Sequence, residues 1–320
     1  MWLTKSSIGR KLVMAVTGVC LVLFVTFHCL MNAVALIWPA AYNSVCSFLG
    51  ANWYALVASM GLALLFVIHI IYALWLTIQN RKARGNDRYA VVKKPAQVEW
   101  SSQNMLVLGI VVVAFLVVHL IQFWARMQLR EIMAASPADW YMVNGAAVPP
   151  HAGTLFLQIA FSQWWTPVVY IIGFVALWFH MNHGFWSMFQ SIGWNGRTWL
   201  ERLKKISLWW TSIVIALFIA QAIVFTIQAN KGTYKTCENL QEQYNAAWQH
   251  EAEQARPESQ QALVDNYLNF LKEFNPERFE EIKAQEEQRQ AYMQAMQAQY
   301  EQVGDEPQAP AEADTTSVVK

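Results

Sequence analysis

Residues 12–38 read LVMAVTGVCLVLFVTFHCLMNAVALIW and contain no acidic side chain, lysine or arginine. A run of about 20 such residues is long enough to cross the hydrocarbon core of a bilayer. Because that core offers no water to backbone N–H and C=O groups, the run must form a helix. Four more apolar stretches follow, at residues 53–77, 105–126, 165–189 and 208–227. The sequence therefore predicts an all-α membrane protein with five transmembrane helices.

The composition argues against an ordinary soluble enzyme and divides the chain in two. Charged residues make up 14% of the chain, whereas a soluble domain carries about 25%. Residues 1–230 hold 15 Lys and Arg against 5 Asp and Glu, and residues 231–320 hold 8 against 17. We therefore predict a transmembrane domain over residues 1–230, a polar helical extension over 231–304 and a disordered tail over 305–320. The first apolar run is too long for the core of a cleaved signal peptide.

Basic residues predict the orientation, because loops on the cytoplasmic side of a membrane carry an excess of Lys and Arg. We expect three such segments in the cytoplasm and, after an odd number of spans, the C-terminal tail in the periplasm. The expected location is the inner membrane of a bacterium, and no nucleic-acid partner is expected. The basic segments are the N-terminus (Lys5, Arg10, Lys11), the loop after the second span (Arg81, Lys82, Arg84, Arg88, Lys93, Lys94) and the loop after the fourth (Arg197, Arg202, Lys204, Lys205).

Histidines suggest the chemistry, since ionisable side chains inside a membrane are costly and usually functional. Five of the seven lie in the predicted spans: His28, His69, His119, His180 and His183. At about 1.5 Å per residue, His28 and His119 lie about 24 and 21 Å from the cytoplasmic ends of their helices. His69 and His180 lie only about 12 and 14 Å from those ends. One outer and one inner pair predict two stacked bis-histidine haems in the bundle of the first four spans.

Four glycines and a fifth histidine refine this prediction. Each of the four helices carries a Gly seven to ten residues from its His, displaced toward the level of the other pair, where a porphyrin edge needs room: Gly18, Gly61, Gly109 and Gly173. Glycine also permits close packing of membrane helices. His180 is favoured as the ligand over His183, which is expected to hydrogen-bond a propionate or a quinone. The alternatives are core histidines of a transporter and, more weakly, a zinc site.

Longer stretches resemble a known family. SSIGRKLVMAVTGVCLVLFVTFHCLMNA at residues 6–33, the helices around His69 and His119, and FHMNHGFWSMFQSIGW at residues 179–194 are similar to the cytochrome b membrane subunit of succinate:quinone oxidoreductases. The likeness is greatest to the single-subunit, five-helix, two-haem branch found with menaquinone-using fumarate reductases and succinate dehydrogenases. It covers residues 1–230.

This resemblance implies ligands, partners and function. It implies His28 and His119 as axial ligands of a distal (outer) haem b, and His69 and His180 as those of a proximal (inner) haem b. It also implies a flavoprotein with covalent FAD and an iron–sulfur subunit on the cytoplasmic face, and the whole complex could form a homodimer. The chain would then be an enzyme subunit that passes electrons between the iron–sulfur subunit and menaquinone, while the dicarboxylate site lies on the flavoprotein. The alternative is the quinone-reactive dihaem subunit of another respiratory dehydrogenase or reductase.

Other candidate positions are less specific. Cationic partners for the propionates of the inner haem are expected among Arg10, Lys11, Lys93 and Arg197, although these residues also serve as orientation signals. A quinone needs hydrogen-bond donors beside an apolar slot. The outer candidates for this role are Asn32, Gln122, Arg126, Gln158 and Gln163, and the inner candidates are Ser6, Ser7 and Arg10.

The loop after the third span and the tail give the remaining predictions. Residues 155–163 are expected to lie in the membrane interface as a short amphipathic helix, and His151 is expected to face solvent. Apolar spacing over residues 235–303 predicts amphipathic helices that break near Pro257 and Pro276. Cys46 and Cys237 both fall on the periplasmic side, where we hypothesise that they form a disulfide.

Overall fold

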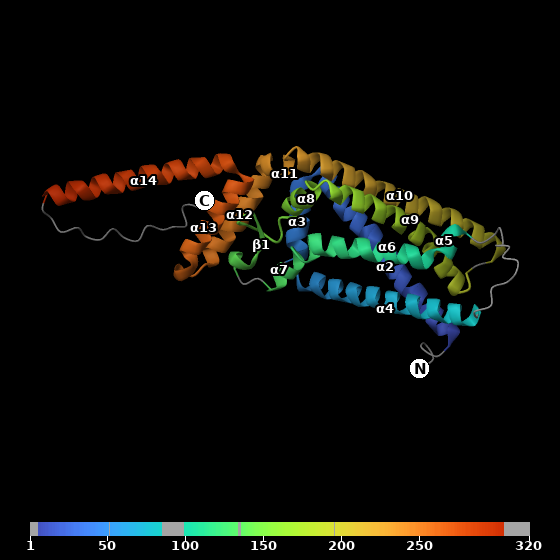
Figure 1. Ribbon diagram of the computed structural model, residues 1–320. Helices are drawn as coiled ribbons and strands as arrows, with labels where there is room; N and C mark the ends of the chain where they lie inside the picture. Colours follow the sequence, from blue (N-terminus) through green and yellow to red (C-terminus); the bar gives the residue numbers. More distant parts are fainter. Residues whose placement is uncertain (1–5, 51, 85–98, 134–135, 195, 304–320) are drawn as a thin grey trace. The chain divides into compact units, whose positions relative to one another are not determined.

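The computed structural model describes residues 6–50, 52–84, 99–133, 136–194 and 196–303. The chain divides into two compact units (Figure 1). Unit 1 comprises Met1–Gln122 and Ile159–Asn230, and unit 2 comprises Phe123–Gln158 and Lys231–Lys320. Within these described residues, five helices are long and apolar enough to cross a membrane. The predicted fold class, an all-α membrane protein, is confirmed.

Unit 1 is built from five long helices: α2 (Ser7–Ile37), α4 (Trp53–Arg84), α6 (Met105–His119), α9 (Trp165–Ser191) and α10 (Arg197–Asn230). Two short helices, α3 (Pro39–Gly50) and α5 (Trp100–Gln103), lie in the connections before α4 and α6. Helix α6 continues as a π-helical turn, η1 (Leu120–Trp124), and α8 (Gly153–Phe161) leads toward α9.

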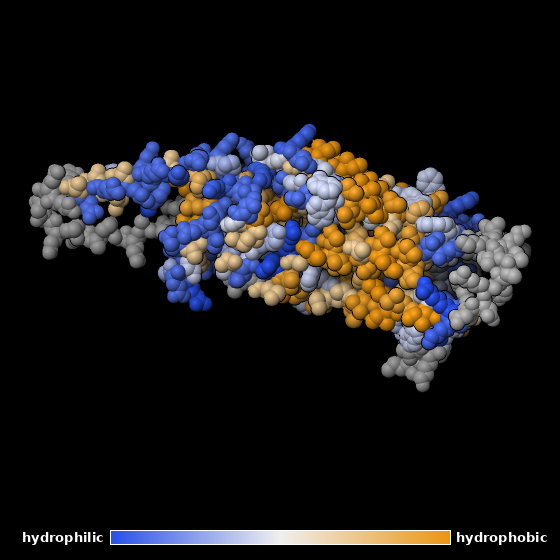
Figure 2. All heavy atoms as spheres, in the orientation of Figure 1, coloured by the Kyte–Doolittle hydropathy of each residue, from blue (hydrophilic) through white to orange (hydrophobic). Residues whose placement is uncertain are grey.

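The outward faces of these helices are apolar, as a lipid-facing surface requires. Large aliphatic and aromatic side chains that are more than half exposed include Leu23, Phe27, Leu64, Ile172 and Ile213. Figure 2 shows hydrophobic residues over the long helices of unit 1, and hydrophilic residues gathered where α4 ends. Burying such a surface in lipid replaces the burial that a soluble protein obtains in its core.

Small residues and polar bridges hold the bundle together. Helix α9 packs against α2, α6 and α10, and α2 also packs against α4. Between α9 and α10, Ser207 Oγ donates to Asn182 Oδ1 at 2.9 Å and Trp178 Nε1 donates to Ser212 Oγ at 3.0 Å. Such bridges between membrane helices contribute about 0.6 kcal/mol each, a modest amount because the unfolded chain in the membrane also finds polar partners. They favour the observed rotation of α9, which carries His180.

Unit 2 is a small folded body of short elements. From the loop after the third span it takes α7 (Gln128–Met133), η2 (Pro137–Asp139), β1 (Tyr141–Val143) and β2 (Ala146–Val148). From the tail it takes α11 (Thr233–Thr236), α12 (Glu238–Gln254), η3 (Pro257–Ser259), α13 (Gln260–Phe274) and α14 (Pro276–Val303). The predicted breaks near Pro257 and Pro276 are confirmed, because a proline ends a helix or begins the next one.

The core of unit 2 joins segments that are far apart in the sequence. Trp140 of the loop packs on Trp248 of α12 with ring centroids 5.0 Å apart, and Trp248 in turn packs on Tyr267 and Phe270 of α13. Helix α13 also packs against β2. All four aromatic side chains are at most 6% exposed. The regularly spaced aromatic residues of the tail therefore form one core together with the loop after the third span.

Three expectations are corrected by this arrangement. The predicted transmembrane domain over residues 1–230 included Phe123–Gln158, which belongs to unit 2. The stretch at residues 155–163 does form helix α8, but Leu155, Phe156 and Leu157 are at most 2% exposed, so it is a buried helix and not an interfacial one. His151 is half-buried instead of solvent-facing, and burial together with the nearby His250 lowers its pKa.

Candidate cofactor site with two pairs of histidine rings

Four of the five histidines in the candidate spans meet in two pairs. His28 of α2 and His119 at the end of α6 have ring centroids 5.8 Å apart, with ring planes at 85°. His69 of α4 and His180 of α9 have centroids 6.4 Å apart, with ring planes at 65°. The pairing expected from their depths is therefore found, with each pair drawn from two helices of like direction.

The spacing of the rings suits two imidazoles on one iron. A metal–imidazole bond of about 2 Å on each side of an iron would separate the two ring centroids by about 6 Å. Both observed separations lie close to this value. The buried Nδ1 atom of His180 has no hydrogen-bond partner within the described ranges. The donor set and its spacing fit an axially coordinated haem, to which the porphyrin itself supplies the other four ligands.

The other histidines in the pairs are held by polar neighbours. His69 Nδ1 lies 3.0 Å from Thr17 Oγ1, and His119 Nδ1 lies 3.2 Å from the Tyr170 hydroxyl. Asn32 Nδ2 lies 3.3 Å from His28 Nε2. Because an amide N–H can only donate, this contact places the lone pair of the His28 ring at Nε2, and a metal bound there would replace the contact with Asn32.

The glycines lie where their helices pass the other pair. A Cβ atom at Gly18 would come within 3.8 Å of His69 Cε1, and one at Gly109 within 3.6 Å of His180 Cε1. A Cβ at Gly173 would collide with Phe115, which lies one turn before His119. A Cβ at Gly61 would meet nothing within 4 Å. Gly18 and Gly109 thus lie beside a histidine of the other pair, where a Cβ would make an ordinary contact, and Gly173 makes room for Phe115.

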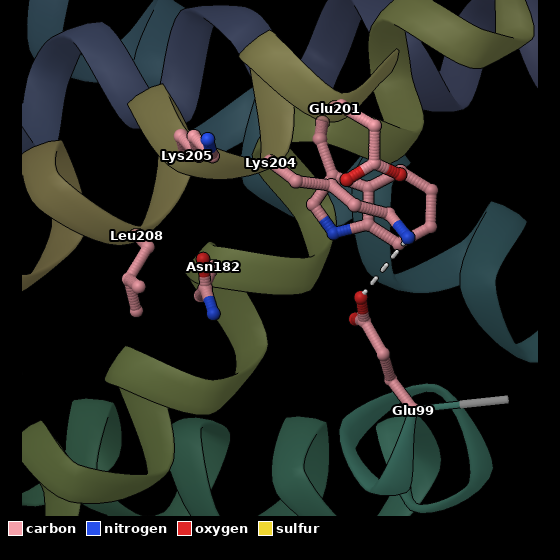
Figure 3. Close-up of a pocket in the computed structure, with 7 residues that line it drawn as sticks. Glu99, Asn182, Glu201, Lys204, Lys205 and Leu208 are labelled. Carbon is pink, nitrogen blue, oxygen red and sulfur yellow. Dashed lines mark ion pairs between the residues drawn. The ribbon is translucent and has the colours of Figure 1, made fainter. Parts of the chain in front are cut away.

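His183 belongs to a different cluster. Its Nδ1 lies 3.4 Å from Glu99 Oε2, and Lys204 Nζ lies 3.6 Å from Glu99 Oε1. Figure 3 shows Glu99 reaching from the start of α5 toward Lys204 at the edge of a pocket. This pocket of about 230 Å³ also includes Asn182 and Trp186. His180, not His183, faces His69, in agreement with the choice made from the sequence.

The four residues considered as partners of the propionates differ in their surroundings. Arg10 lies over the Trp75 ring at 5.4 Å, and with the Gln79 side-chain oxygen turned toward it, Arg10 Nη1 donates to that oxygen at 2.6 Å. Arg10 Nε is buried without a partner in the described part of the chain. Lys11 is exposed, Arg197 begins α10 with a side chain that is not described, and Lys93 lies outside the described residues. Of Arg10 and Lys11, the two whose side chains the structure describes, Arg10 has the geometry suited to an anion.

The residues considered for quinone have different surroundings. Gln122, only 5% exposed, donates from Nε2 to Thr166 Oγ1 at 3.2 Å and accepts from the Tyr170 hydroxyl at 3.0 Å. One N–H of its amide is therefore used inside the bundle, and the second leaves its role as a quinone donor a prediction. Asn32 is also engaged, because it donates to the His28 carbonyl at 2.8 Å and accepts from the Tyr42 hydroxyl at 3.3 Å.

The remaining candidates lie elsewhere. Arg126 belongs to unit 2, where its guanidinium lies 4.4 Å from the Tyr141 ring centroid. Gln163 is exposed just before α9, and Gln158 is buried in α8. Cys46 belongs to unit 1 and Cys237 to unit 2. The hypothesised Cys46–Cys237 disulfide therefore stays a prediction.

Sequence reasoning missed three residues that contact the histidines: Thr17, Tyr170 and Glu99. A signal for two of them was present, because Thr17 adjoins Gly18 and Tyr170 precedes Gly173 by one turn. Each of these glycines marks the level at which its helix passes the other pair. Comparison of the chain with protein-family models, curated proteins and solved structures finds no match.

Proposed function

We propose that this chain is a dihaem cytochrome b membrane anchor of a succinate dehydrogenase or fumarate reductase complex. The observation that carries the proposal is the meeting of four imidazoles in two pairs, each with ring centroids about 6 Å apart as two metal–imidazole bonds require. The family resemblance of residues 1–230 supplies the identity of the complex. Electrons would pass between an iron–sulfur subunit and membrane menaquinone.

The haems supply one-electron redox chemistry, and the chain supplies their ligands and surroundings. His28 and His119 would hold the outer haem b, and His69 and His180 the inner one. Arg10 is suited to receive a propionate, since its buried Nε has no partner among the residues that the structure describes. Apolar side chains of the bundle keep water away, which is one of the means by which proteins set haem potentials.

The partners and orientation belong to the same proposal. Basic loops favour a cytoplasmic N-terminus and a periplasmic tail in a bacterial inner membrane. A flavoprotein with FAD and an iron–sulfur subunit would then dock on the cytoplasmic face. The dicarboxylate would bind to the flavoprotein, and this chain would make no bond to it.

Haem content is the decisive measurement. We expect a dithionite-reduced minus oxidised spectrum, with pyridine haemochrome quantitation, to give two b-type haems per chain. His28→Ala, His69→Ala, His119→Ala and His180→Ala should each lose one haem. His183→Ala is the matched control and should keep both, because its side chain lies with Glu99. A folded chain that binds no haem when haem is supplied would refute the proposal.

A second experiment tests the complex. Purification of the chain from its native membrane should bring with it a large flavoprotein that retains its flavin after denaturation, and succinate should reduce the haems. A dihaem chain that arrives with a different dehydrogenase would instead identify the alternative, a quinone-reactive subunit of another respiratory enzyme.

A further inference from the structure

In each pair, one of the two histidines is in contact with a buried hydroxyl group. At the inner pair, His69 Nδ1 lies 3.0 Å from Thr17 Oγ1. At the outer pair, His119 Nδ1 lies 3.2 Å from the Tyr170 hydroxyl. Thr17 is 3% exposed and Tyr170 is 4% exposed, so water does not compete for these bonds.

The direction of the inner hydrogen bond follows from the helix around it. The single hydrogen of the Thr17 hydroxyl is donated backward within α2, to Val13 O at 2.9 Å and Met14 O at 3.1 Å. The Thr17 oxygen can then only accept from His69. This places the N–H of the imidazole at Nδ1 and leaves the lone pair at Nε2, where a metal binds.

The outer hydrogen bond is directed by a longer chain. The Tyr170 hydroxyl donates to Gln122 Oε1 at 3.0 Å, and Gln122 Nε2 donates to Thr166 Oγ1 at 3.2 Å. The phenol has one hydrogen, so its oxygen accepts from His119 Nδ1. The π-helical turn η1 carries Gln122 just after His119, and such turns are frequent at functional sites.

Each hydroxyl group lies on a helix that supplies a histidine to the other pair. Thr17 supports the inner pair from α2, which contributes His28 to the outer pair. Tyr170 supports the outer pair from α9, which contributes His180 to the inner pair. Each of these two helices therefore provides a ligand at one level and a hydrogen-bond acceptor at the other.

From this arrangement we infer that Thr17 and Tyr170 are positioning residues. Thr17 fixes the ring tautomer of His69 and lowers the reduction potential of the inner haem. Tyr170 fixes the ring tautomer of His119 and lowers the reduction potential of the outer haem. The inference rests on the proposed function. A hydrogen bond from Nδ1–H makes an imidazole a stronger ligand. A stronger donor favours the more highly charged ferric iron, so the potential falls. At the inner pair, His180 Nδ1 has no partner among the described residues, so the contact with Thr17 distinguishes His69 from its partner ring.

Two isosteric substitutions test the inference on the full chain with both haems bound. The two midpoint potentials are first assigned with the ligand variants described above. Thr17→Val should raise the midpoint potential of the inner haem alone, and Tyr170→Phe that of the outer haem alone. The low-spin ferric EPR signal of the same haem should shift in each case. Thr17→Ser keeps the hydroxyl and should restore the parent potential.

A threonine elsewhere on α2 provides the control. Thr26 also donates to a carbonyl one turn back, at Val22, but it accepts from Trp210 and not from a histidine. Thr26→Val should leave both potentials unchanged. Gln122→Leu removes the acceptor of the Tyr170 hydrogen while the phenol remains, and it should shift the outer potential and EPR signal even where Tyr170→Phe retains less haem.

The outcomes separate this inference from the proposed function. Two haems whose potentials and EPR signals stay unchanged in Thr17→Val, Tyr170→Phe and Gln122→Leu would overturn the inference and leave the proposed function standing. Equal shifts of both haems in every variant would also overturn it, because the two contacts act at separate levels. Absence of haem from the unmodified folded chain would instead refute the proposed function.

Discussion

At the scale of single residues, close packing near the histidines makes one glycine irreplaceable. A Cβ at Gly173 would lie 2.8 Å from Phe115 Cβ and closer still to its ring. Phe115 is also packed against Tyr170 and Phe174, with ring centroids 5.1 and 5.5 Å away, so it has little room to move. Side-chain size at this position is therefore set by tertiary contact and not by helix propensity.

Gly173→Ala should accordingly destabilise unit 1 by about 1–3 kcal/mol, the usual cost of overpacking a core. The change should appear as a lower thermal unfolding midpoint in detergent. Gly61→Ala is the matched control, since its new methyl group meets nothing within 4 Å, and its midpoint should not fall. Equal midpoints for Gly173→Ala and the parent chain would contradict the packing argument.

A buried carboxyl group makes the stability of unit 2 depend on pH. Burial raises the pKa of Glu131 from 4.5 to about 7. The fold therefore disfavours the charged form, and unit 2 loses stability as pH rises from about 4.5 to about 7. Glu131→Gln should protect Phe123–Gln158 from proteolysis at pH 8, compared with the parent chain at the same pH, and should change little at pH 4.5.

The opposite sign is expected at Glu286. The hydrogen bond from Arg289 lowers the pKa of this exposed carboxyl group, so the charged form is slightly favoured in the fold. Glu286→Gln should give no protection at pH 8 and a small loss at most, because exposed ion pairs contribute little. Protection of unit 2 by both substitutions would show that general charge reduction, and not the burial of Glu131, is responsible.

At the scale of elements, the β1–β2 hairpin depends on its turn. Asn144 and Gly145 join the two strands with φ of 50° and 85°, and Tyr141, Met142 and Val143 pair with Val148, Ala147 and Ala146. Positive φ at both positions is typical of the two-residue turn that matches the twist of paired strands. The buried strand β2 in turn presents Ala146, Ala147 and Val148 to the core of unit 2.

Gly145→Ala should destabilise unit 2 by about 1 kcal/mol, because an alanine pays roughly that amount in the left-handed region. Hydrogen exchange of β1 and β2 amides should become faster. The new methyl group meets nothing within 4 Å, so a clash would not explain the effect. Asn144→Gly tolerates positive φ and serves as the control. Unchanged exchange in Gly145→Ala would mean that the turn adapts without strain.

At the scale of the whole molecule, the tail and the loop after the third span form one body. Trp248 is completely buried, and its ring packs against Trp140 of the loop. The Thr154 hydroxyl lies 2.6 Å from the Tyr244 hydroxyl, which donates to Tyr234 O at 3.1 Å. Loop residues are therefore partners of the tail, and neither segment has a complete core without the other.

A chain that ends at Asn230 should lose this body and keep the histidine bundle, which lies entirely in unit 1. Limited proteolysis should then cut residues 136–158 rapidly, since the aromatic partners of the loop are gone. In the full chain, Trp248→Ala should have the same effect in milder form, with a loss of about 3–5 kcal/mol. Persistent protection of the loop in the truncated chain would show that it folds alone.

The sequence was sufficient to predict properties that depend only on distance along a helix. The five spans follow from apolar length alone, because a bilayer leaves a helix as the only way to satisfy the backbone. The two levels of His28 with His119 and His69 with His180 follow from the rise per residue of a helix. The Asn-Gly pair at 144–145 was also a readable hairpin signal, although it was not used for a prediction.

Tertiary structure alone decided the rest, because it fixes the rotation of each helix about its axis and joins segments distant in sequence. The rotation of α2 and α9 about their axes brings Thr17 to His69 and Tyr170 to His119. The depth of a residue in the membrane does not predict these contacts. It also turns Gln122 inward, where its amide is used within the bundle. Burial of apolar side chains against the loop made a folded body of a tail whose sequence is mostly polar, since a few well-placed aromatic residues supply its core.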